Sequence, residues 1–458
     1  MEGTKFRLAE HQEYAVYMMD VNPSLGLFYD LGTGKTMIAL AWMYRAMQRG
    51  EIQTALVVCP ASLVSNWEEN IDKMVQFEGF TAAGVAELKR AVTVVSFQKT
   101  YRVARTPVQH RDGQTTVKRS ISLRPEIDRP WGAVIVDELH NLGGHSSIQT
   151  KAALTLARLT KHRYGLTATP VTGGKGKEDF SKLYGEIRFL EPDIWPNWTT
   201  FCSRYVTNYD RWHNPTDYNI PSCRALMINH AIVCRMEDCF DMPDRVESVI
   251  SCPLVEAKAY RDLRKGNYEP YNIDIEMAGG QYTKMLQVCS GSMKRTPEQG
   301  GTLVMRCSKD EAFTEVLNST NDKVVVFCSY RASVDRCAEL CRKAGRETIV
   351  YDGRCRDKSA WKKFQHGSAT AIVCQYNSGS EGLDLFASSH MIMWEPCFSA
   401  RLFEQATGRI YRKGQTKRCE FVYLSTPGTL EEKSWSTVRS GVEITVEMLE
   451  NWAHGEEF

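Results

Sequence analysis

The hydrophobic residues of this chain gather in short apolar runs that recur in two separate series. The first series comprises residues 55–58 (ALVV), 92–96 (VTVVS) and 133–137 (AVIVD). Unbroken apolar runs of this length are typical of strands that are buried on both faces, as in a parallel sheet. A second series of the same kind comes much later in the chain, at residues 324–327, 371–374, 391–394 and 421–424.

Segments with helical spacing separate these runs, for instance residues 37–47 and 331–344. Strands that alternate with helices favour an α/β fold in which the strands form open parallel sheets. At 458 residues the chain is also longer than one ordinary hydrophobic core, which favours two domains. We therefore predict two open α/β sheets, one for each series.

The stretch between the two series differs in composition, because it is rich in aromatic residues and is punctuated by Pro and Gly. We predict that residues 173–235 are a largely helical elaboration of a first lobe that spans residues 1–235. Residues 236–320 are expected to form a crossover and linker segment. Residues 321–458 are expected to form a second lobe that ends in a helix.

A further insertion, at residues 101–130, precedes the last run of the first series and holds seven Arg or Lys residues against three acidic ones. Asp112 and Gly113 are a strong turn signal between alternating segments, so a basic β-hairpin is one interpretation. A solvated surface loop is the other, and the sequence does not decide between them.

The overall composition is that of an ordinary globular protein, with 43% hydrophobic and 24% charged residues. The net charge is only +2, so any nucleic-acid surface must be local. No apolar run approaches the roughly 18 to 20 residues that span a bilayer, and the first residues lack the pattern of a signal peptide. A cytoplasmic location without membrane contact is therefore expected. The 15 cysteines are interpreted as small buried hydrophobes, with a zinc site at Cys234, Cys239 and Cys252 beside His230 as the alternative.

A candidate nucleotide site follows the short apolar run LGLFYD, where the next residues complete the sequence DLGTGKT. Gly32 and Gly34 can adopt the unusual dihedral angles that turn backbone N–H groups toward a phosphate. Lys35 would place a cation on the β- and γ-phosphates, and the Thr36 hydroxyl can ligate Mg²⁺. The helix that follows points its positive end at the anion. The pattern predicts that ATP and Mg²⁺ bind here.

The second half of this site is the sequence DELH at residues 137–140. Open α/β sheets bind ligands at the carboxyl ends of their strands, which is where the apolar run delivers Asp137 and Glu138. Asp137 would hold Mg²⁺, usually through water, and Glu138 would polarise the attacking water. Two adjacent carboxylates are often only surface residues, but the phosphate loop upstream favours the nucleotide site. That loop matches the looser pattern G-x-G-K-T, because Tyr29 stands where the first glycine of the standard pattern would be.

From residue 8 to residue 432, the order of motifs resembles that of superfamily 2 helicases and translocases, in particular the Swi/Snf-like branch. The stretches that carry the resemblance are LAEHQ, VVCPASLVSNW, VVSF and LTATP, followed later by VVVFCSY, SGSEGLDL and EQATGRIYRKGQ. The passage at residues 234–253 is also similar to the family's crossing between its lobes, although only Arg235 is present where the family has paired arginines. The resemblance implies two RecA-like parallel-sheet lobes in tandem, with a helical insertion between the motifs of the two lobes.

The resemblance also implies roles for individual residues. The implied ATP contacts are Gln12, Gly32, Thr33, Gly34, Lys35, Thr36, Gly382 and Asp384. The residues implied to contact DNA are Pro60, Ser62, Asn66, Ser96, Ser329 and Ser378, to which a basic hairpin would add Arg111, Lys118 and Arg119. The implied links between the carboxylates and the DNA groove are His140, Thr167 and Thr169.

The run EQATGRIYRKGQ has a physical logic of its own. Arg409 and Arg412 are three residues apart, so we predict that they share one face of a helix. The resemblance implies that they act as arginine fingers, which reach from the second lobe to the γ-phosphate held by the first. Gln405 is implied to position the water or the γ-phosphate. The predicted catalytic residues are therefore Lys35, Glu138, Gln405, Arg409 and Arg412.

Together these motifs predict an ATP-driven motor whose lobes grip the phosphates of a DNA strand with little dependence on sequence. The chain is close to the family's compact core, and compact relatives are often phage or bacterial proteins that remodel branched DNA. We therefore expect fork regression or branch migration, with branched or duplex DNA as the partner. The alternatives are a duplex translocase that displaces bound proteins, an RNA helicase, and a nucleotide-gated binding module without turnover.

Overall fold

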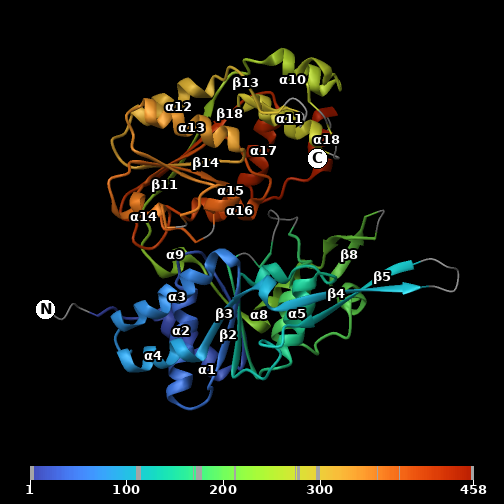
Figure 1. The fold of residues 1–458 in the computed structure, drawn as a ribbon, viewed down its shortest axis with the longest axis vertical. Helices are drawn as coiled ribbons and strands as arrows, with labels where there is room; N and C mark the ends of the chain where they lie inside the picture. Colours follow the sequence, from blue (N-terminus) through green and yellow to red (C-terminus); the bar gives the residue numbers. More distant parts are fainter. Residues whose placement is uncertain are drawn as a thin grey trace. The chain divides into compact units, whose positions relative to one another are not determined.

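The chain folds into two compact units, each built on one six-stranded sheet (Figure 1). The first unit contains the residues up to Val171 together with the segment that ends at Phe240, and the second continues from Asp241. The computed structural model describes residues 5–454 except 110–114, 169, 172–177, 211–212, 274, 276–278, 296–299, 358 and 381.

The sheet of the first unit has the strand order β10-β1-β7-β6-β2-β3, and every neighbouring pair is parallel. Its strands are β1 (Ser24–Tyr29), β2 (Ala55–Cys59), β3 (Val92–Ser96), β6 (Ala133–Asp137), β7 (His162–Thr167) and β10 (Ala231–Cys234). The apolar runs expected to form strands in this lobe all lie in the sheet, which confirms the prediction of a parallel α/β fold. β7 and β10 are additional strands that the apolar pattern did not indicate.

Helices cover both faces of this sheet because successive strand residues point to opposite sides. One face, which includes Leu27 and Val57, packs against four helices that precede β6. The opposite face, which includes Phe28 and Val58, packs against four helices that follow β6. The first set is α1 (Glu10–Val21), α2 (Lys35–Gln48), α3 (Val64–Lys73) and α4 (Ala82–Ala91). The second set is α5 (Ile148–Ala157), α6 (Leu183–Leu190), α7 (Trp198–Tyr205) and α8 (Ile220–His230).

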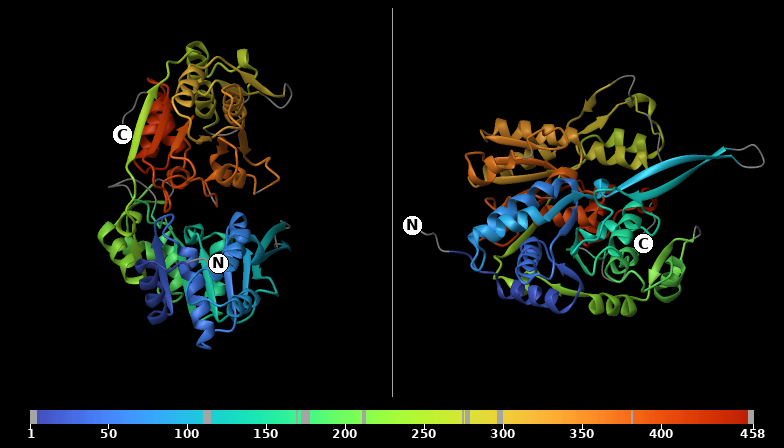
Figure 2. Two further views of the ribbon diagram at one scale, coloured as in Figure 1. Left: turned by 90° about the vertical axis from the view of Figure 1, so that its left-hand side faces the viewer. Right: turned by 60° about the horizontal axis from the view of Figure 1, so that its bottom comes forward.

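The basic insertion is a β-hairpin in which β4 (Tyr101–Gln109) pairs antiparallel with β5 (Thr115–Leu123). The hairpin interpretation is thereby confirmed, while the turn expected at Asp112 and Gly113 lies outside the described residues. The two strands form a sheet of their own and project from the first unit as a narrow ribbon (Figure 2).

The aromatic-rich segment predicted at residues 173–235 is only partly the helical elaboration that was expected. Its described residues contain α6, α7 and α8, but also the hairpin of β8 (Val206–Tyr209) with β9 (Pro215–Tyr218), and the short α9 (Met236–Cys239) follows the segment. Its last strand, β10, joins the edge of the main sheet beside β1. The aromatic residues account for the composition of this segment, because Tyr184, Trp195 and Phe201 pack in one core cluster.

The sheet of the second unit has the strand order β11-β18-β17-β14-β16-β15 and is also parallel throughout. Its strands are β11 (Arg245–Ser251), β14 (Val324–Cys328), β15 (Thr348–Tyr351), β16 (Ala371–Gln375), β17 (His390–Met393) and β18 (Cys419–Ser425). The four apolar runs of the second series form β14, β16, β17 and β18, except that Trp394 lies directly after β17. A separate small hairpin joins β12 (Ser292–Lys294) to β13 (Thr302–Val304).

The second sheet is likewise covered on both faces. α12 (Lys309–Asn318) and α13 (Arg331–Lys343) pack on the face that includes Val324 and Val326. The face that includes Val325 and Phe327 packs against α11 (Gly280–Cys289), α16 (Ala400–Thr407) and α17 (Leu430–Arg439). The remaining helices are α10 (Ala257–Arg264), α14 (Trp361–His366), α15 (Tyr376–Gly379) and α18 (Val446–His454).

Within the described ranges, no helix combines the length and the apolar character needed to cross a bilayer. The cysteines are free thiols and most are buried, as expected for small hydrophobes. The sulfur atoms of Cys234 and Cys239 lie 2.6 Å apart. The part of the chain that the structure describes nevertheless contains no group of three or more side chains able to hold a metal ion, so the zinc alternative has no support.

Candidate active site

The phosphate loop connects β1 to α2, and two glycines give it its shape. Gly32 has a φ of 83° and Gly34 a φ of 87°, in the left-handed region that strains any residue with a side chain. A Cβ atom on Gly34 would also lie only 2.1 Å from Nε2 of Gln12. Gly34 precedes α2 and provides no side-chain cap, so the first N–H groups of this helix remain available to an anion.

Lys35, the first residue of α2, folds back over the loop. Its Nζ donates hydrogen bonds to the carbonyl oxygens of Tyr29 and Asp30, at 2.6 and 3.0 Å. Oγ1 of the buried Thr33 donates to the same Asp30 oxygen at 2.8 Å. Thr36 follows in the first turn of the helix and is half-buried. A turned loop, a cation and a helix N-terminus within a few residues fit the phosphates of ATP.

Gln12 lies against this loop from α1. Its Nε2 donates to the Thr33 carbonyl oxygen at 3.1 Å, and its Oε1 accepts from the Ala9 N–H at 3.0 Å. Nε2 of His11 lies 2.9 Å from the same Thr33 oxygen. The structure thus places Gln12 beside the phosphate loop, and its two hydrogen bonds use only one of its two amide N–H donors and one of its two oxygen lone pairs.

Asp137 ends β6 and is held in one orientation by two donors. Nε1 of Trp67 donates to its Oδ2 at 2.7 Å, and the Glu138 N–H donates to its Oδ1 at 3.0 Å. Trp67 lies in α3 and is only 1% exposed. Bonds of this kind orient carboxylates that ligate metals. Sequence reasoning missed Trp67, although it closes the motif VVCPASLVSNW and is the one indole donor there.

Glu138 has a left-handed backbone, with φ 52° and ψ 55°. A residue with a long side chain rarely adopts this conformation, which persists where the surroundings impose it and is common at functional sites. Oε2 of Glu138 lies 3.3 Å from Nδ1 of His140, and the same nitrogen lies 2.9 Å from Oγ1 of Thr167. All three residues are buried. Glu138 is therefore joined through His140 to the end of β7.

The strand order explains why these groups come together. β7 lies between β1 and β6, with Thr167 paired to Phe28 and Leu166 paired to Asp137. The loop after β1, the threonine at the end of β7 and the carboxylate at the end of β6 therefore share the carboxyl edge of the sheet, where open α/β sheets bind ligands. Thr169, the third residue expected to link the carboxylates to DNA, lies outside the described residues.

The DNA contacts expected in the first unit follow neighbouring strands. Cys59 at the end of β2 pairs with Ser96 at the end of β3, so Pro60 and Ser96 lie at adjacent strand ends. Ser62 is exposed and Asn66 half-buried, whereas Ser96 is only 6% exposed. Of the expected hairpin contacts, Lys118 and Arg119 lie in β5, where only the backbone is described, and Arg111 lies outside the described residues.

In the second unit, Ser329 follows β14 and Ser378 lies in α15, directly after β16. The two strands are neighbours, and Cys328 pairs with Gln375 at their ends. Nε2 of Gln375 donates to the Ser329 carbonyl oxygen at 3.0 Å. The structure therefore brings these two expected DNA contacts to one edge of the second sheet.

Arg409 and Arg412 do not share a helix face, because α16 ends at Thr407 and both arginines lie in the turns that follow. They converge nevertheless, since Nη1 of each donates to the Leu383 carbonyl oxygen, at 3.0 and 3.3 Å respectively. Arg412 also forms an ion pair with Asp384. Leu383 and Asp384 follow Gly382, whose φ is 74°, so the glycine-rich loop and the arginines form one contact region.

Gln405 lies one turn before these arginines, on α16. It is 1% exposed, and its backbone oxygen accepts a hydrogen bond from Nε of Arg409 at 2.9 Å. Its side-chain Oε1 is buried and has no hydrogen-bond partner among the residues that the structure describes. A buried acceptor in this state gains stability when a donor approaches it.

Two family profiles match the chain. The SNF2-related domain matches residues 11–294, which is more than half of the chain, and the helicase conserved C-terminal domain matches residues 308–414. A DNA repair and recombination protein RAD54-like from Drosophila erecta is 23% identical over 88% of this chain, which spans only 57% of that relative. A probable global transactivator of Orgyia pseudotsugata multicapsid polyhedrosis virus is 25% identical over 91% of this chain and 85% of its own length. Among solved structures, a Sulfolobus solfataricus SWI2/SNF2 ATPase core in complex with dsDNA is similar with a TM-score of 0.41 and 21% identity, over 99% of this chain and 94% of that one.

Proposed function

Because the chain belongs to the SNF2-related family, we propose that it is a DNA-dependent ATPase that moves along DNA. The observation that carries this proposal is the contact chain from Glu138 through His140 to Thr167, at the sheet edge that also holds the phosphate loop. A carboxylate bound in this way responds to changes at the end of β7. Hydrolysis and nucleic-acid contact can therefore be linked within the first unit.

The chemistry assigned to each group of the first unit follows from its place. The loop N–H groups and Lys35 bind the phosphates of ATP, for which the Lys35 ammonium leaves the carbonyls of Tyr29 and Asp30. Thr36 and Asp137 hold Mg²⁺, which neutralises phosphate charge when it is bound. This donor set fits Mg²⁺, which is usually held by one or two carboxylates together with substrate phosphates. Glu138 orients the attacking water and takes up its proton.

The second unit supplies positive charge. Arg409 and Arg412 stabilise the charge that develops during phosphoryl transfer, which requires them to leave the Leu383 oxygen and Asp384. Oε1 of Gln405 accepts a hydrogen bond from the attacking water, or its Nε2 donates one to the γ-phosphate. Gly382 and Asp384 contact the nucleotide as Arg412 moves.

DNA is bound through phosphates by residues that follow strand ends. In the first unit these are Pro60, Ser62, Asn66 and Ser96, and in the second they are Ser329 and Ser378. Contacts of this kind place the protein on a strand without reading its sequence, so affinity should fall steeply with salt and depend little on sequence. Thr167, Thr169 and His140 transmit the state of this contact to Glu138.

We further propose that branched DNA is the preferred substrate, through fork regression or branch migration. The β4–β5 ribbon supports this, because it projects from the body of the first unit (Figure 2) and its two strands include basic residues in their sequence. The RAD54-like relative, a DNA repair and recombination protein, points to the same area of DNA metabolism.

The test is a comparison of ATP hydrolysis and product release on single-stranded, duplex, forked and four-way DNA and on RNA. We expect DNA to stimulate hydrolysis, forked and four-way DNA to be remodelled, and Lys35→Ala to remove both activities. Full DNA-stimulated hydrolysis by Lys35→Ala would refute the proposal. Stimulation by duplex alone without strand rearrangement would favour a duplex translocase, and stimulation by RNA alone would favour an RNA helicase.

The role of the ribbon is tested separately by changing Arg111, Lys118 and Arg119 together to Gln. We expect remodelling of forked DNA to fall much more than hydrolysis without DNA, because the ribbon lies outside the nucleotide site. Lys151→Gln, which changes an exposed lysine of α5, is the control for the loss of positive charge. Equal losses of both activities, or no loss of either, would show that the ribbon has no role in remodelling DNA.

A further inference from the structure

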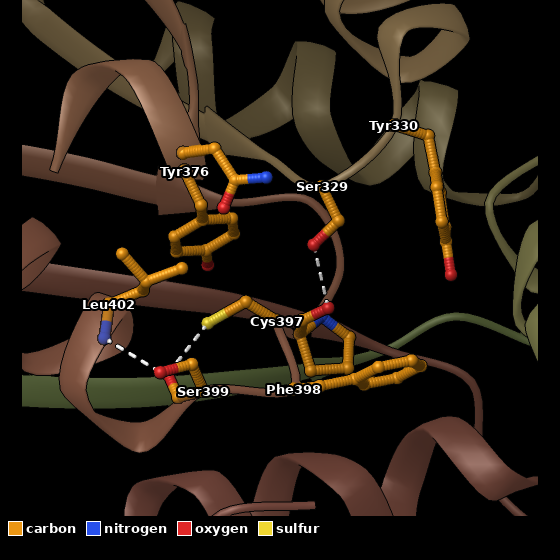
Figure 3. Close-up of a pocket in the computed structure, with 9 residues that line it drawn as sticks. Ser329, Tyr330, Tyr376, Cys397, Phe398, Ser399 and Leu402 are labelled. Carbon is orange, nitrogen blue, oxygen red and sulfur yellow. Dashed lines mark hydrogen bonds between the residues drawn. The ribbon is translucent and has the colours of Figure 1, made fainter. Parts of the chain in front are cut away.

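A pocket of about 220 Å³ opens in the second unit, beside the ends of β14, β16 and β17 (Figure 3). Three chain segments, all of which follow strands of the sheet, form its walls. The lining residues used below are Ser329, Tyr330, Tyr376, Asn377, Phe398 and Leu402. None of them belongs to the nucleotide site described above. The pocket is thus a candidate site in the second unit that is separate from the nucleotide-binding residues of either unit.

The lining selects for an uncharged ligand with a flat face. Aromatic rings of Tyr330, Tyr376 and Phe398 contribute to the walls, and Figure 3 shows Tyr376 and Tyr330 on either side of Ser329. No described residue that lines the pocket carries a charge, so a phosphate, carboxylate or metal ion would be buried there without a partner. Hydroxyl and amide groups, including the exposed Asn377, remain able to contact a polar edge. The volume is below the range of about 300 to 1,000 Å³ that is common for drug-sized ligands.

Hydrogen bonds hold the walls of the pocket together without a ligand. Glu395 is 1% exposed, and its Oε1 accepts hydrogen bonds from the N–H groups of Ser329 and Tyr330, at 2.7 and 3.0 Å. The Ser329 hydroxyl donates to the Pro396 carbonyl oxygen at 2.8 Å, and the Tyr376 hydroxyl donates to the Glu395 carbonyl oxygen at 3.4 Å. One buried carboxylate thus joins the loop after β14 to the loop after β17. A pocket held in shape in this way loses little conformational entropy when a ligand enters.

We infer that this pocket receives an unpaired nucleobase of the bound DNA. A base is uncharged and planar, stacks on aromatic side chains, and presents hydrogen-bonding groups at its edge. This inference rests on the proposed function, in which Ser329 and Ser378 contact a strand backbone. Ser329 is part of the pocket wall and Ser378 follows Asn377, so a strand that touches both passes the opening of the pocket.

The consequence is a preference for DNA with unpaired bases. Within a duplex each base is paired and stacked, and must be unstacked before it can enter a protein pocket. At a fork or along a single strand this cost is small. The pocket therefore distinguishes junctions from plain duplex without reading the base sequence.

The test measures binding of the full chain, by fluorescence anisotropy, to labelled single-stranded, forked and blunt duplex DNA. Stacking on one ring contributes about 1 to 3 kcal/mol per base, so Phe398→Ala should weaken single-stranded and forked binding about tenfold and leave duplex binding unchanged. Phe398→Tyr keeps the ring and should restore binding. Val304→Ala, at an apolar residue of β13 that is 73% exposed and does not line the pocket, is the control.

A second measurement uses the unaltered protein and does not depend on the folding of a variant. Nucleotides in the single-stranded arm of the fork are replaced one at a time by abasic sites, and affinity is expected to fall about tenfold at one position. A flat abasic profile, or an equal loss of duplex and single-stranded binding by Phe398→Ala, overturns the pocket assignment even if DNA still stimulates hydrolysis. Absence of both DNA binding and DNA-stimulated hydrolysis in the unaltered protein would instead overturn the proposed function.

Discussion

Replacing Trp67 with Phe isolates one hydrogen bond at the proposed metal site. The indole N–H donates to Oδ2 of Asp137 at 2.7 Å inside the core of the first unit. A hydrogen bond to a charged group contributes about 1.5 to 3 kcal/mol, and the loss of a partner that orients a metal-ligating residue typically lowers metal affinity or activity roughly 10- to 100-fold. We therefore expect Trp67→Phe to lower kcat/KM for ATP by roughly 10- to 100-fold and to raise the Mg²⁺ concentration needed for half-maximal activity.

Trp42→Phe provides a matched control for the packing change. Trp42 is buried in the same core cluster as Trp67, and both are at most 1% exposed. Among the described residues, however, the Trp42 Nε1 has no hydrogen-bond partner. Both substitutions remove the same atoms from the same core, but only Trp67→Phe removes a donor from Asp137.

The assay is steady-state ATP hydrolysis with saturating DNA over a Mg²⁺ titration, with the melting temperature of each variant measured in parallel. Trp67→Phe should shift the Mg²⁺ dependence, whereas Trp42→Phe should change only the melting temperature. If both variants lose activity equally at every Mg²⁺ concentration, the loss comes from packing and the assigned role of Trp67 is wrong. Retention of full activity by Trp67→Phe would refute it as well.

Two further predictions concern buried side chains that can carry a charge. Lys309→Met is expected to destabilise the second unit by about 3 to 5 kcal/mol, because it leaves the buried carboxylate of Glu431 without its cation. Nζ of Lys309 lies 2.5 Å from Oε1 of Glu431, and both side chains are fully buried. Calorimetry should show that the double change Lys309→Met with Glu431→Leu recovers most of this loss of stability. Glu186→Gln is expected to stabilise the first unit more at about pH 8 than at about pH 5, because burial raises the pKa of Glu186 well above its ordinary value. As the pH rises past that ordinary value, the unfolded chain loses its proton while the folded chain keeps it, so native stability falls; thermal unfolding at both pH values, with the exposed Glu191→Gln as control, measures the difference.

The strands that were evident from the sequence are those buried on both faces. Every residue of β2, β6 and β14 is buried, and an unbroken apolar run is the direct result. β11 was missed because most of its side chains are exposed at a sheet edge, where polar residues are tolerated. β7 was missed although it is central, since its run is broken by Gly165, where a Cβ atom would lie 2.4 Å from Cδ2 of Leu139. A close approach to a neighbouring segment is a tertiary property that spacing along the chain does not encode.

Some residues of the proposed sites could be recognised from the sequence and others could not. Phosphate binding and metal binding need particular residue types at short, fixed spacings, and Gly32, Gly34 and Lys35 could be identified on that basis. Trp67 and Glu395 act through contacts with residues that are distant in the sequence, Asp137 in the first case and Ser329 and Tyr330 in the second. Trp67 closes the motif VVCPASLVSNW, but nothing in the spacing of that motif shows that its indole reaches Asp137. Only the folded strand order makes these contacts possible.

The arginines show how a short spacing can mislead. A separation of three places two residues on one helix face only where the helix continues, and α16 ends before Arg409. The turn that follows is held by Gln415, whose Nε2 lies within hydrogen-bond distance of the carbonyl oxygens of Phe386, Ser388 and Ile410, at 3.2, 2.8 and 3.3 Å. Arg409 and Arg412 therefore reach the same Leu383 oxygen from the turn that Gln415 holds, and not from a shared helix face. Any ligand that displaces the glycine-rich loop must therefore release both guanidinium groups together, so the loop and the arginines are expected to respond to nucleotide as one element.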